Sequence, residues 1–529
     1  MTVLAETFCA IIARHAHDRP DHPFLREGER CLTYAQTQTT IGRLAGVLAA
    51  RGVARGERCV ILMENGLDYA LAWLALSRLG AVSVLINQAY MGAILEHQLK
   101  LVEPRAFIID ESQSAKLGAL VANGAIEASL VFHGRSAAAA TAPYSFGTPV
   151  VDLWRSPDDP LLPEATATPD VSEVMSIFYT SGTTGPSKAV AYTHAQGWQT
   201  AQTVAEYLDE SDVFYMTNPM CHVSLPHCLG AALLAGGTLA VREKFSANSF
   251  WSDVRCYRAT VTMMLGAVAS FVNSRPPAPD DRDHTLRKVL MVPLLKNVAQ
   301  FCARFDVEVM SWFNMTEVSV PLHTGGFSRM REPLPSRPRP GAQVRIVDDR
   351  DRPVPPGTPG ELVVRDDAPW LISSGYWNNP QETVEAWRNL WFHTGDLFVE
   401  PRPGHYQFLD RLKDCIRRRG ENIASFEVEQ QILCHQDVAE AAVMGVPADD
   451  GEQEVLAVVT LKVGAALAPE SLLDFLQLRL PYFCVPRYVS IQHAPLPKTP
   501  TGKITKNDLR AAGKALAWDR EQHGYQMRR

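Results

Sequence analysis

The sequence predicts an α/β fold, with a large N-terminal domain of several subdomains and a small α+β domain at the C-terminal end. Three observations support this prediction. Strand-like and helix-like segments alternate from about residue 56 to residue 320, short strands dominate after Gly341, and a charged link near residue 410 precedes the last segment. Such alternation is typical of layered, largely parallel sheets covered by helices.

The alternating region contains short apolar runs that we interpret as strands. Their length and their content of β-branched and aromatic residues favour buried strands. Helical stretches such as 297–305 lie between them, and the first residues of the chain have the pattern of an amphipathic helix. The runs include 58–63, 82–86, 174–180, 212–217, 238–242, 259–265, 288–292 and 307–313.

Residues 213–241 carry no charge at all. The prolines, the asparagine and the Gly-Gly pair within this stretch argue against a membrane span. We interpret it as a strand, a turn, a buried helix and a second strand. His222 and His227 then lie in an apolar setting. We therefore expect no integral membrane segment.

After Gly341 the pattern of alternating strands and helices gives way to short strands. Short strands at 344–347 and 361–365 predict a small β-rich subdomain, and a strand at 406–414 continues into the charged link. The remaining residues suffice for a separate α+β domain. Its predicted elements are helices at 426–434 and 471–480 and strands at 438–446, at 454–462 and near Tyr488. Residues 136–143, with the prolines that follow up to 169, predict a surface connection.

The composition narrows the function classes. With 46% hydrophobic and 21% charged residues, the 529-residue chain has the balance of a soluble globular protein. Its net charge of -7 gives no reason to expect a nucleic-acid or membrane partner. Ten scattered cysteines form no CxxC pair, and the N-terminus carries no secretory pattern, so we expect reduced, mostly buried thiols and a cytoplasmic location. No pattern indicates an oligomeric state.

The stretch YTSGTTGPSKAV, residues 179–190, combines hydroxyl side chains, two glycines and Lys188 between a predicted strand and a predicted helix. Glycines let the backbone fold tightly, while hydroxyl and N–H groups can donate to an anion. A Walker P-loop is excluded because serine and alanine flank Lys188. A polyphosphate-binding loop and an ordinary Gly/Ser/Thr surface loop both fit these residues.

Four further stretches concentrate polar side chains. Each has a structural alternative: Glu317 as an acid at a helix start, Asp396 as a turn residue, and Lys413 and Lys503 as solvated lysines. The stretches are 313–317, 391–396, 410–414 with 417–422, and 497–503.

Together and in this order, these stretches resemble the adenylate-forming superfamily of acyl-CoA synthetases, luciferases and peptide-synthetase adenylation domains. The resemblance extends from Leu32 to Lys503 and includes GEL at 360–362, GYWNNP at 375–380 and LPYFCVP at 480–486. RRGENI at 418–423 and FCARF at 301–305 are most similar to the branch of carnitine- and crotonobetaine-CoA ligases.

The resemblance implies an AMP-forming acid–thiol ligase. A carboxylate attacks the α-phosphorus of ATP and expels pyrophosphate, and the thiol of CoA then attacks the acyl-adenylate and releases AMP. The first step brings an anion toward a polyanion, so it needs cations, N–H donors and Mg²⁺ directed at the phosphates. ATP, Mg²⁺, CoA and a small carboxylic acid are the implied ligands.

The resemblance also implies roles for individual residues. The loop grips the terminal phosphates, Phe313 stacks on adenine, and Asp396 binds the ribose with help from Arg411. The implied catalytic residues are Lys503, Glu317, Thr316 and His222; the ATP- and AMP-binding residues are Thr180, Ser181, Gly182, Thr183, Thr184, Lys188, Phe313, Asn314, Asp396 and Arg411; and the metal residues are Glu317 and Thr184.

Relatives of this kind rotate their small domain between the two steps. The implied parts are an N-terminal domain at 1–409, a hinge at 410–414 around Lys413, and a mobile C-terminal domain at 415–529. Rotation would withdraw Lys503 and bring Gly420 to the thiol. Arg418 and Arg419 could meet CoA phosphates, although a solvated positive edge explains this basic run as well.

The acyl pocket implied by the resemblance is mostly apolar. His222 orients the acid or gates the second step, and His227 is a pocket or core histidine. The candidate pocket residues are His222, Leu225, His227, Gly230, Met264, Leu265, Gly266 and Val320.

The sequence departs from the family pattern at two positions and in one segment. Ala189 replaces a glycine that usually follows the loop lysine. Asn314 also replaces a glycine; asparagine tolerates left-handed geometry, and it narrows the floor of the pocket. Residues 291–297 replace a Gly-rich turn that touches adenine, which weakens the expected adenine contact.

Residues 221–226 contain no aspartate to pair with an α-ammonium group. This argues against an amino acid and for a lipophilic carboxylic acid. Two alternatives stay open within the class: an enzyme that loads a carrier protein, and an enzyme that performs only one half-reaction. A non-catalytic binding protein is disfavoured because the key charged residues are all retained.

Overall fold

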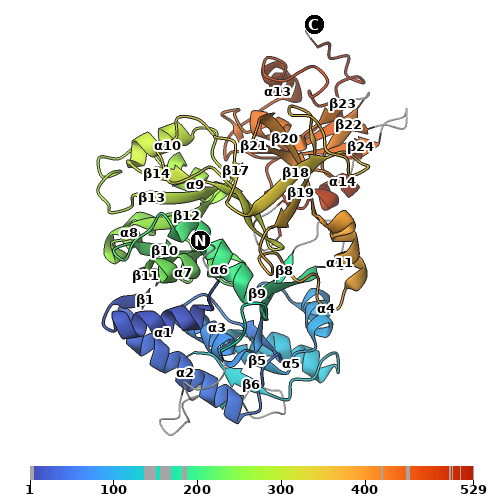
Figure 1. Cartoon of the computed structure of the whole chain (residues 1–529). Coiled ribbons are helices and arrows are strands. Elements are labelled where there is room, and N and C mark those ends of the chain that lie inside the picture. The colour runs from blue at the N-terminus through green and yellow to red at the C-terminus, as the bar shows by residue number, and fades with distance from the viewer. Residues whose placement is uncertain are drawn as a thin grey trace. The chain divides into compact units, whose positions relative to one another are not determined.

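The computed structural model describes residues 5–135, 150–154, 168–180, 187–418, 421–447, 453–499, 502, 504–512 and 514–527. The chain folds into two compact units (Figure 1). The first comprises Met1–Thr180, Pro186–Gln343 and Val364–Leu390, and the second comprises Ser181–Gly185, Val344–Val363 and Trp391–Arg529. The predicted mixed α/β class is confirmed. The predicted boundaries at 409/410 and 414/415 concern a moving part and stay predictions.

The first unit contains a sheet of seven strands in the order β14-β13-β12-β10-β11-β1-β2. All neighbours are parallel except β1 and β2, which form an antiparallel hairpin. The strands are β1 Pro23–Glu27, β2 Arg30–Thr33, β10 Val213–Met216, β11 Thr238–Val241, β12 Val261–Leu265, β13 Lys288–Val292 and β14 Glu308–Met310.

A second seven-stranded sheet of the same unit has the order β7-β6-β5-β3-β4-β8-β9. It is parallel apart from the antiparallel pair β8 and β9. The strands are β3 Arg58–Leu62, β4 Val82–Leu85, β5 Ala106–Ile109, β6 Val131–His133, β7 Val150–Asp152, β8 Val174–Thr180 and β9 Lys188–Thr193.

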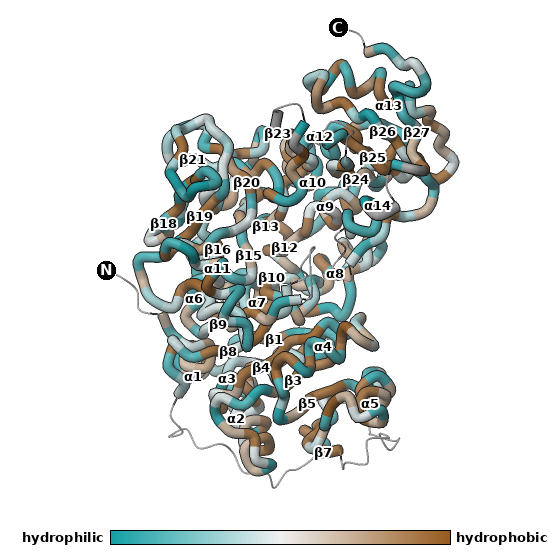
Figure 2. Tube along the Cα trace, turned by 90° about the vertical axis from the view of Figure 1, so that its right-hand side faces the viewer, coloured by the Kyte–Doolittle hydropathy of each residue, from teal (hydrophilic) through white to brown (hydrophobic). Residues whose placement is uncertain are grey.

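Helices cover both sheets of this unit. The main core packs helices such as α3, which is buried on nearly every side, between the two sheets, and the apolar strands are prominent in Figure 2. Smaller cores lie beneath the helices on the outer faces. The helices are α1 Phe8–Asp18, α2 Tyr34–Ala50, α3 Leu67–Leu79, α4 Gly92–Val102, α5 Ser114–Ala122, α6 His194–Ala205, α7 Ser224–Ala235, α8 Phe250–Tyr257, α9 Gly266–Ser274, α10 Val298–Phe305 and α11 Pro380–Ala386.

Most predicted strands of this unit are confirmed, and residues 213–241 form the predicted strand, turn, buried helix and strand. The helix expected after the phosphate loop is confirmed as α6, although β9 comes first and pairs back onto β8. The run 307–313 divides into β14 and β15 (Trp312–Met315). Within the predicted surface connection, β7 pairs with β6, while residues 136–149 and 155–167 lie outside the described part.

A small antiparallel sheet, β15-β16-β17, follows β14 in the first unit. β16 spans Val318–His323 and β17 spans Arg337–Pro338. Its register pairs Phe313 with Leu322 and Met315 with Val318. Three residues of β16 therefore face one residue of β15, which makes a bulge on β16.

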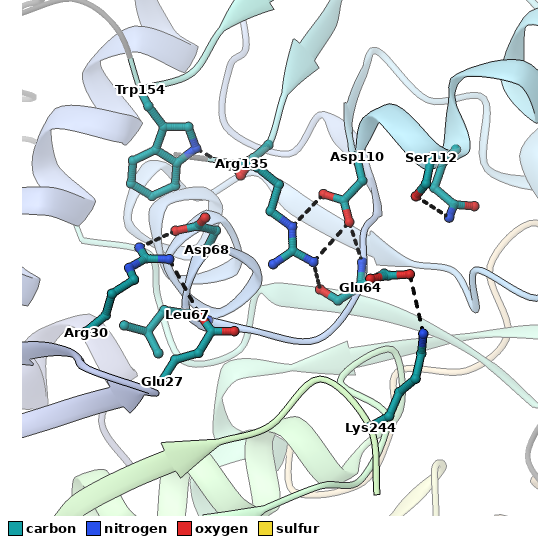
Figure 3. Close-up of polar contacts among 12 residues, drawn as sticks. Glu27, Arg30, Glu64, Leu67, Asp68, Asp110, Ser112, Arg135, Trp154 and Lys244 are labelled. Carbon is teal, nitrogen blue, oxygen red and sulfur yellow. Dashed lines mark hydrogen bonds and ion pairs between the residues drawn. The ribbon is translucent and has the colours of Figure 1, made fainter. Parts of the chain in front are cut away.

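A polar network ties the two large sheets together near the start of α3 (Figure 3). Arg30, next to the β1–β2 turn, bonds the buried Asp68 of α3 at 2.6 Å. After β5, Asp110 accepts two bonds from Arg135 at 3.0 and 3.1 Å and one from the backbone N–H of Glu64. Burial acts to lower the pKa of Arg135, but the hydrogen bonds and charge of Asp110, together with the charges of Asp68 and Glu27, raise it.

The second unit contains most of a sheet in the order β18-β19-β20-β21. The start of β18 and the end of β19 belong to the first unit. A β22-β23 hairpin and a sheet in the order β24-β25-β26-β27 follow with three helices, as predicted for an α+β domain. The elements are β18 Ala342–Val347, β19 Gly360–Asp366, β20 Phe392–Arg402, β21 His405–Arg411, β22 Ile416–Arg418, β23 Glu421–Ile423, α12 Ser425–Ile432, β24 Val438–Pro447, β25 Gln453–Leu461, α13 Pro469–Leu476, β26 Tyr488–Gln492, α14 Lys506–Ala512 and β27 Trp518–Asp519.

All ten cysteines are free thiols, and six of them are buried, in line with the prediction. Burial raises the pKa of the Cys9 thiol to about 11. Across the described ranges, no helix combines the length and the apolar character that crossing a bilayer requires.

Candidate active site

The candidate site residues of the first unit gather where parallel strands end. β10, β12, β13 and β14 run in the same direction, so the segments that follow them start at one edge of the sheet. In open α/β sheets, ligands bind outside this carboxyl edge. These segments carry His222 and His227, Leu265 and Gly266, residues 291–297, and residues 312–317.

The turn between β15 and β16 presents Thr316 and Glu317. Glu317 is only 4% exposed, and its Oε1 accepts a hydrogen bond from the Tyr376 hydroxyl at 2.9 Å. Burial, followed by the proximity of Glu317, raises the pKa of Tyr376, so this phenol stays a donor. The Thr316 carbonyl accepts a bond from Gln196 of α6 at 2.9 Å. The turn is thus fixed from two sides.

Lys188 begins β9 directly opposite Thr180, the last residue of β8. The two ends of the glycine-rich loop therefore lie on adjacent strands. The Lys188 ammonium forms an ion pair with Glu382 and lies 4.9 Å from the centre of the Tyr376 ring. Tyr376 thus contacts both Lys188 and Glu317. The loop residues Ser181, Gly182, Thr183 and Thr184 lie outside the described part of the chain.

Local sequence explains why Glu382 sits where it does. Asn379 caps α11 by accepting a hydrogen bond from the Glu382 N–H, and Pro380 occupies the first helical position. Both residue types are typical of a helix start. Glu382 therefore lies in the first turn of α11.

Asn314 of β15 contacts two other elements. Its Oδ1 accepts a bond from the Val320 N–H at 2.8 Å, and its Nδ2 lies 3.1 Å from Nε2 of His227 on α7. His227 also packs edge-on against Trp312, with ring centres 4.9 Å apart. Burial lowers the pKa of His227 to about 3, so the ring is neutral near pH 7. Asn314 does not use the left-handed geometry that asparagine tolerates; Val320 has the positive φ, at 45°.

Alternation along β15 separates its side chains. Trp312 and Asn314 both contact His227, so the half-buried Phe313 lies on the opposite face of the strand. Its expected role against adenine stays a prediction. His222, in the turn before α7, is half-buried.

The structure corrects part of the predicted acyl pocket. A Cβ on Gly230 would lie 2.6 Å from Ala201 and 2.7 Å from Phe8, so this glycine permits helix packing. Met264 and Leu225 belong to hydrophobic cores, because their positions on β12 and α7 direct them into the packed layers. Leu265 ends β12 at the sheet edge, Gly266 begins α9 directly after it, and Gly266 lies against Pro293.

Asp396 and Arg411 lie in the second unit on the paired strands β20 and β21. Asp396 is 4% exposed, and its Oδ1 is 3.6 Å from Nε of Arg411. The Leu412 N–H bonds the carbonyl of Gly395, and Lys413 lies exposed in the turn that follows. Lys413 thus occupies a short turn between two pieces of regular structure, and its hinge role stays a prediction.

Arg418 differs most from its expected position. It is buried within the second unit, where its Nε lies 2.7 Å from Glu454 and its Nη1 donates to the Phe483 carbonyl at 2.6 Å. In this arrangement Arg418 supports the fold. Its guanidinium is already bonded inside the unit, so its position does not suit a contact with CoA phosphates. Arg419, Gly420 and Lys503 lie outside the described residues.

Sequence reasoning missed Tyr376, Glu382 and Gln196 as parts of the site. Tyr376 lies in the GYWNNP stretch, which was noticed without a role for any of its residues. Glu382 follows it in PQET. Gln196 has no signal in the sequence beyond a polar residue on a buried helical face, and this signal is too general to identify a site.

Comparisons with known proteins found similar sequences and similar folds. The relatives include the crotonobetaine/carnitine–CoA ligases of Salmonella arizonae and Proteus mirabilis, each 29% identical over about nine-tenths of this chain and 93% of their own length. Among solved structures, ATP-bound MatB from Rhodopseudomonas palustris has a TM-score of 0.83 at 26% identity, over 96% of this chain and 99% of its own. The anthranilate CoA ligase AuaEII, with anthranoyl-AMP, shares the fold at 21% identity and a TM-score of 0.84, over 97% and 98%.

Family models extend the agreement across both units. Residues 12–377 match the model of the AMP-binding enzyme, and residues 427–503 match the model of its C-terminal domain. The first match alone covers more than half of the sequence. The chain therefore belongs to the family of AMP-binding enzymes, as its motifs predicted.

Proposed function

We propose that this chain is an AMP-forming acid–thiol ligase. In the first step a carboxylate oxygen attacks the α-phosphorus of ATP, and the bond to pyrophosphate breaks. In the second step the sulfur of CoA attacks the acyl carbon, the thiol proton is lost, and AMP leaves. Each step is a substitution in which the incoming group replaces the outgoing one, and no oxidant or reductant is needed.

One observation carries this proposal: Lys188, Tyr376 and Glu317 form a connected line beside the glycine-rich loop. The line places a cation next to the loop that would hold the terminal phosphates and places a carboxylate near the carboxyl edge of the sheet. Opposite charges at these two positions suit a nucleotide polyphosphate that carries a metal ion.

The side chains present fit a Mg²⁺ ion that arrives with ATP. Within the described residues, no three His, Cys, Asp or Glu side chains cluster as a resident metal site requires. Protein-bound Mg²⁺ commonly uses one or two carboxylates together with substrate phosphates. Glu317 would be such a ligand, Thr184 is the second proposed ligand, and the ion would neutralise phosphate charge. The Tyr376 hydroxyl would orient the Glu317 carboxylate.

The remaining roles extend to the second unit. Asp396 would accept hydrogen bonds from the ribose hydroxyls with Arg411 beside it, and Lys503 would reach the α-phosphate. Lys413 would be the hinge of a domain at 415–529, and Gly420 would approach the thiol in the second step. A few residues in a turn are enough to absorb such a rotation.

The proposed acid is lipophilic and has no α-ammonium group. Residues 221–226 offer no carboxylate for such a group. A quaternary ammonium would call for aromatic faces, and Trp312, the aromatic beside His227, is 5% exposed. The chain is similar to betaine-activating ligases in sequence, so crotonobetaine and carnitine belong in any test of substrates.

The test is pyrophosphate release with ATP, Mg²⁺ and a panel of acids, with and without CoA. The panel contains straight-chain, alicyclic, aromatic, betaine and amino acids. Acid-dependent release, with acyl-CoA formed only when CoA is present, would support the ligase. Product formed on a holo carrier protein but not on CoA would favour a carrier-loading enzyme. Thioester formation from a synthetic acyl-adenylate, without pyrophosphate release, would leave only the second step.

A further inference from the structure

Asn65 joins the two large sheets of the first unit at the segment that leads to His222. It follows β3 of one sheet, and the segment 218–222 follows β10 of the other. The Asn65 Nδ2 donates to the Asn218 carbonyl at 2.9 Å, and its Oδ1 accepts from the Met220 N–H at 2.8 Å. One side chain, only 9% exposed, therefore holds the backbone just before His222 at two points.

These two bonds suit an amide in particular. The Asn218 carbonyl needs a donor and the Met220 N–H needs an acceptor, and a side-chain amide offers both in one plane. Asn218 and Met220 are both buried, so their backbone groups have to find partners inside the protein. The two partners also fix the orientation of the Asn65 amide, because exchanging its ends would place like groups against each other.

The segment 218–222 is itself a compact turn. The Pro219 carbonyl accepts from the His222 N–H at 3.3 Å and from the Ser224 hydroxyl at 2.7 Å, and the Met220 side chain lies in the main core. Bonds within the turn determine its shape, whereas the Asn65 bonds attach it to the other sheet. A displacement of Asn65 would therefore move the backbone that carries His222.

The position of Asn65 is in turn fixed by the polar network of Figure 3. The N–H of the preceding residue, Glu64, donates to Asp110 at 2.7 Å, and the Glu64 carbonyl accepts from Arg135 at 3.1 Å. The backbone entering Asn65 is thus held from both sides. A side chain on such a rigid support can position another group with the precision that a reaction requires.

We propose that Asn65 is a positioning residue of the ligase: it connects the polar network to the 218–222 turn and keeps His222 in place. This inference rests on the proposed ligase function, in which His222 orients the acid or gates the second step. It adds a residue that acts through His222 rather than by contact with a substrate.

The test is a double-mutant cycle on the full-length enzyme, measured as acyl-CoA formation with the best acid of the panel. Asn65→Ala should lower kcat/KM for the acid by about ten- to a hundredfold, since a displacement of about 1 Å can cost a hundredfold. In the His222→Ala background the same change should cost less than about twofold, because the positioned group is already absent. The Kd of ATP should change by less than about twofold.

A matched control is Asn123→Ala, which makes the same replacement at an exposed residue after α5. It should keep the kcat/KM of the unmodified enzyme. Asn65→Asp serves if the alanine variant folds poorly, because it keeps the shape and the acceptor for the Met220 N–H and loses the donor to Asn218. Its loss of kcat/KM should likewise disappear in the His222→Ala background.

Equal losses of kcat/KM in both backgrounds would overturn the inference and leave Asn65 a purely structural residue. An unmodified enzyme that turns over no acid would instead count against the proposed ligase function. The inference would then be judged by NMR of the histidine Cε1–H groups, with the resonance of His222 assigned from His222→Gln. A shift of this resonance in the Asn65 variants, with that of the buried His194 unmoved, would support the inference, and an unmoved His222 resonance would refute it.

Discussion

At the residue scale, Lys188, the lysine proposed to bind phosphate, is held by groups that ATP would have to replace. Lys188 pairs with Glu382 and lies over the Tyr376 ring. Both partners of the ion pair are more than a third exposed, so the pair contributes less than about 1 kcal/mol. Such a contact is weak enough for phosphate oxygens to displace, and it would orient the ammonium before ATP binds.

Replacing Glu382 with Gln should therefore tighten ATP binding. The variant removes the competing carboxylate and keeps the shape of the side chain. We expect the Kd of ATP, measured by calorimetry without acid, to fall about two- to fivefold, the range of a solvent-exposed ion pair. Glu385→Gln on the same helix, whose carboxylate lies 3.7 Å from Arg388, is the matched control and should leave the Kd unchanged. A weaker affinity for ATP in Glu382→Gln would contradict the competition.

Buried histidines should make the fold sensitive to acid. Burial lowers the pKa of His194 to about 4 and that of His227 to about 3, below the ordinary value of 6.5. Between these values and 6.5 the unfolded chain binds more protons than the folded chain, so stability falls as pH drops below 6.5. Each histidine should remove about 1 kcal/mol per pH unit in this window.

Urea unfolding between pH 5 and pH 7.5 measures this slope. In His194→Gln the slope should decrease by the share of one histidine, while His17→Gln, which changes an exposed residue of α1, should leave it unaltered. An unchanged slope in His194→Gln would show that the folded and unfolded chains bind protons equally at His194, against the lowered pKa.

Sequence patterns predicted the charged candidate residues, such as Glu317, better than the residues that contact and orient them, such as Tyr376. Glu317 was predicted because the 313–317 stretch and the order of the other polar stretches resemble the adenylate-forming superfamily. Tyr376 and Glu382 contact Glu317 and Lys188 from a segment about sixty or more residues away in sequence, and no local pattern records such a contact. Gly230 was misplaced for the same reason: only the partners Ala201 and Phe8 reveal that it serves helix packing.

At the element scale, strands with strong apolar runs were predictable and short polar strands were not. β9 contains Lys188 and Thr193 and follows a glycine-rich loop, so its sequence is equally typical of a loop. Its strand form comes from pairing with β8. The β16 bulge is likewise a property of the hairpin, since nothing in the residues around Val320 announces a positive φ.

The network between α3 and the strands should be an important source of stability. Asp110 is 5% exposed, and Arg135 provides two of its hydrogen bonds. Removing one partner of a buried pair leaves an uncompensated charge, so Arg135→Ala should lower the free energy of unfolding by about 3 kcal/mol. Arg105→Ala removes an exposed contact with Glu57 at 3.8 Å and should cost less than about 1 kcal/mol. Equal midpoints in denaturant for both variants would refute a structural role of the network.

At the scale of the whole molecule, composition and motif order were enough to predict the α/β class and the family, because both depend on averages and on spacing along the chain. The proposed rotation of the C-terminal domain would depend instead on contacts that form and break during the reaction. The sequence names the residues for this rotation, Lys413 and Lys503, through resemblance alone. Their roles are testable because the two half-reactions can be assayed separately.

Lys503→Ala should separate these half-reactions. In the first step the carboxylate and the α-phosphate are both anionic, and a lysine between them stabilises the charge of the transition state. We therefore expect acid-dependent pyrophosphate release to fall by at least about a hundredfold, which corresponds to the loss of one well-placed charged donor. Thioester formation from a supplied acyl-adenylate and CoA should stay within about threefold of the unmodified enzyme. Lys462→Ala, which changes an exposed lysine of the same unit, serves as the control and should retain both steps. Equal loss of both steps in Lys503→Ala would mean that Lys503 remains at the site throughout, and the rotation of the small domain would then have to be abandoned.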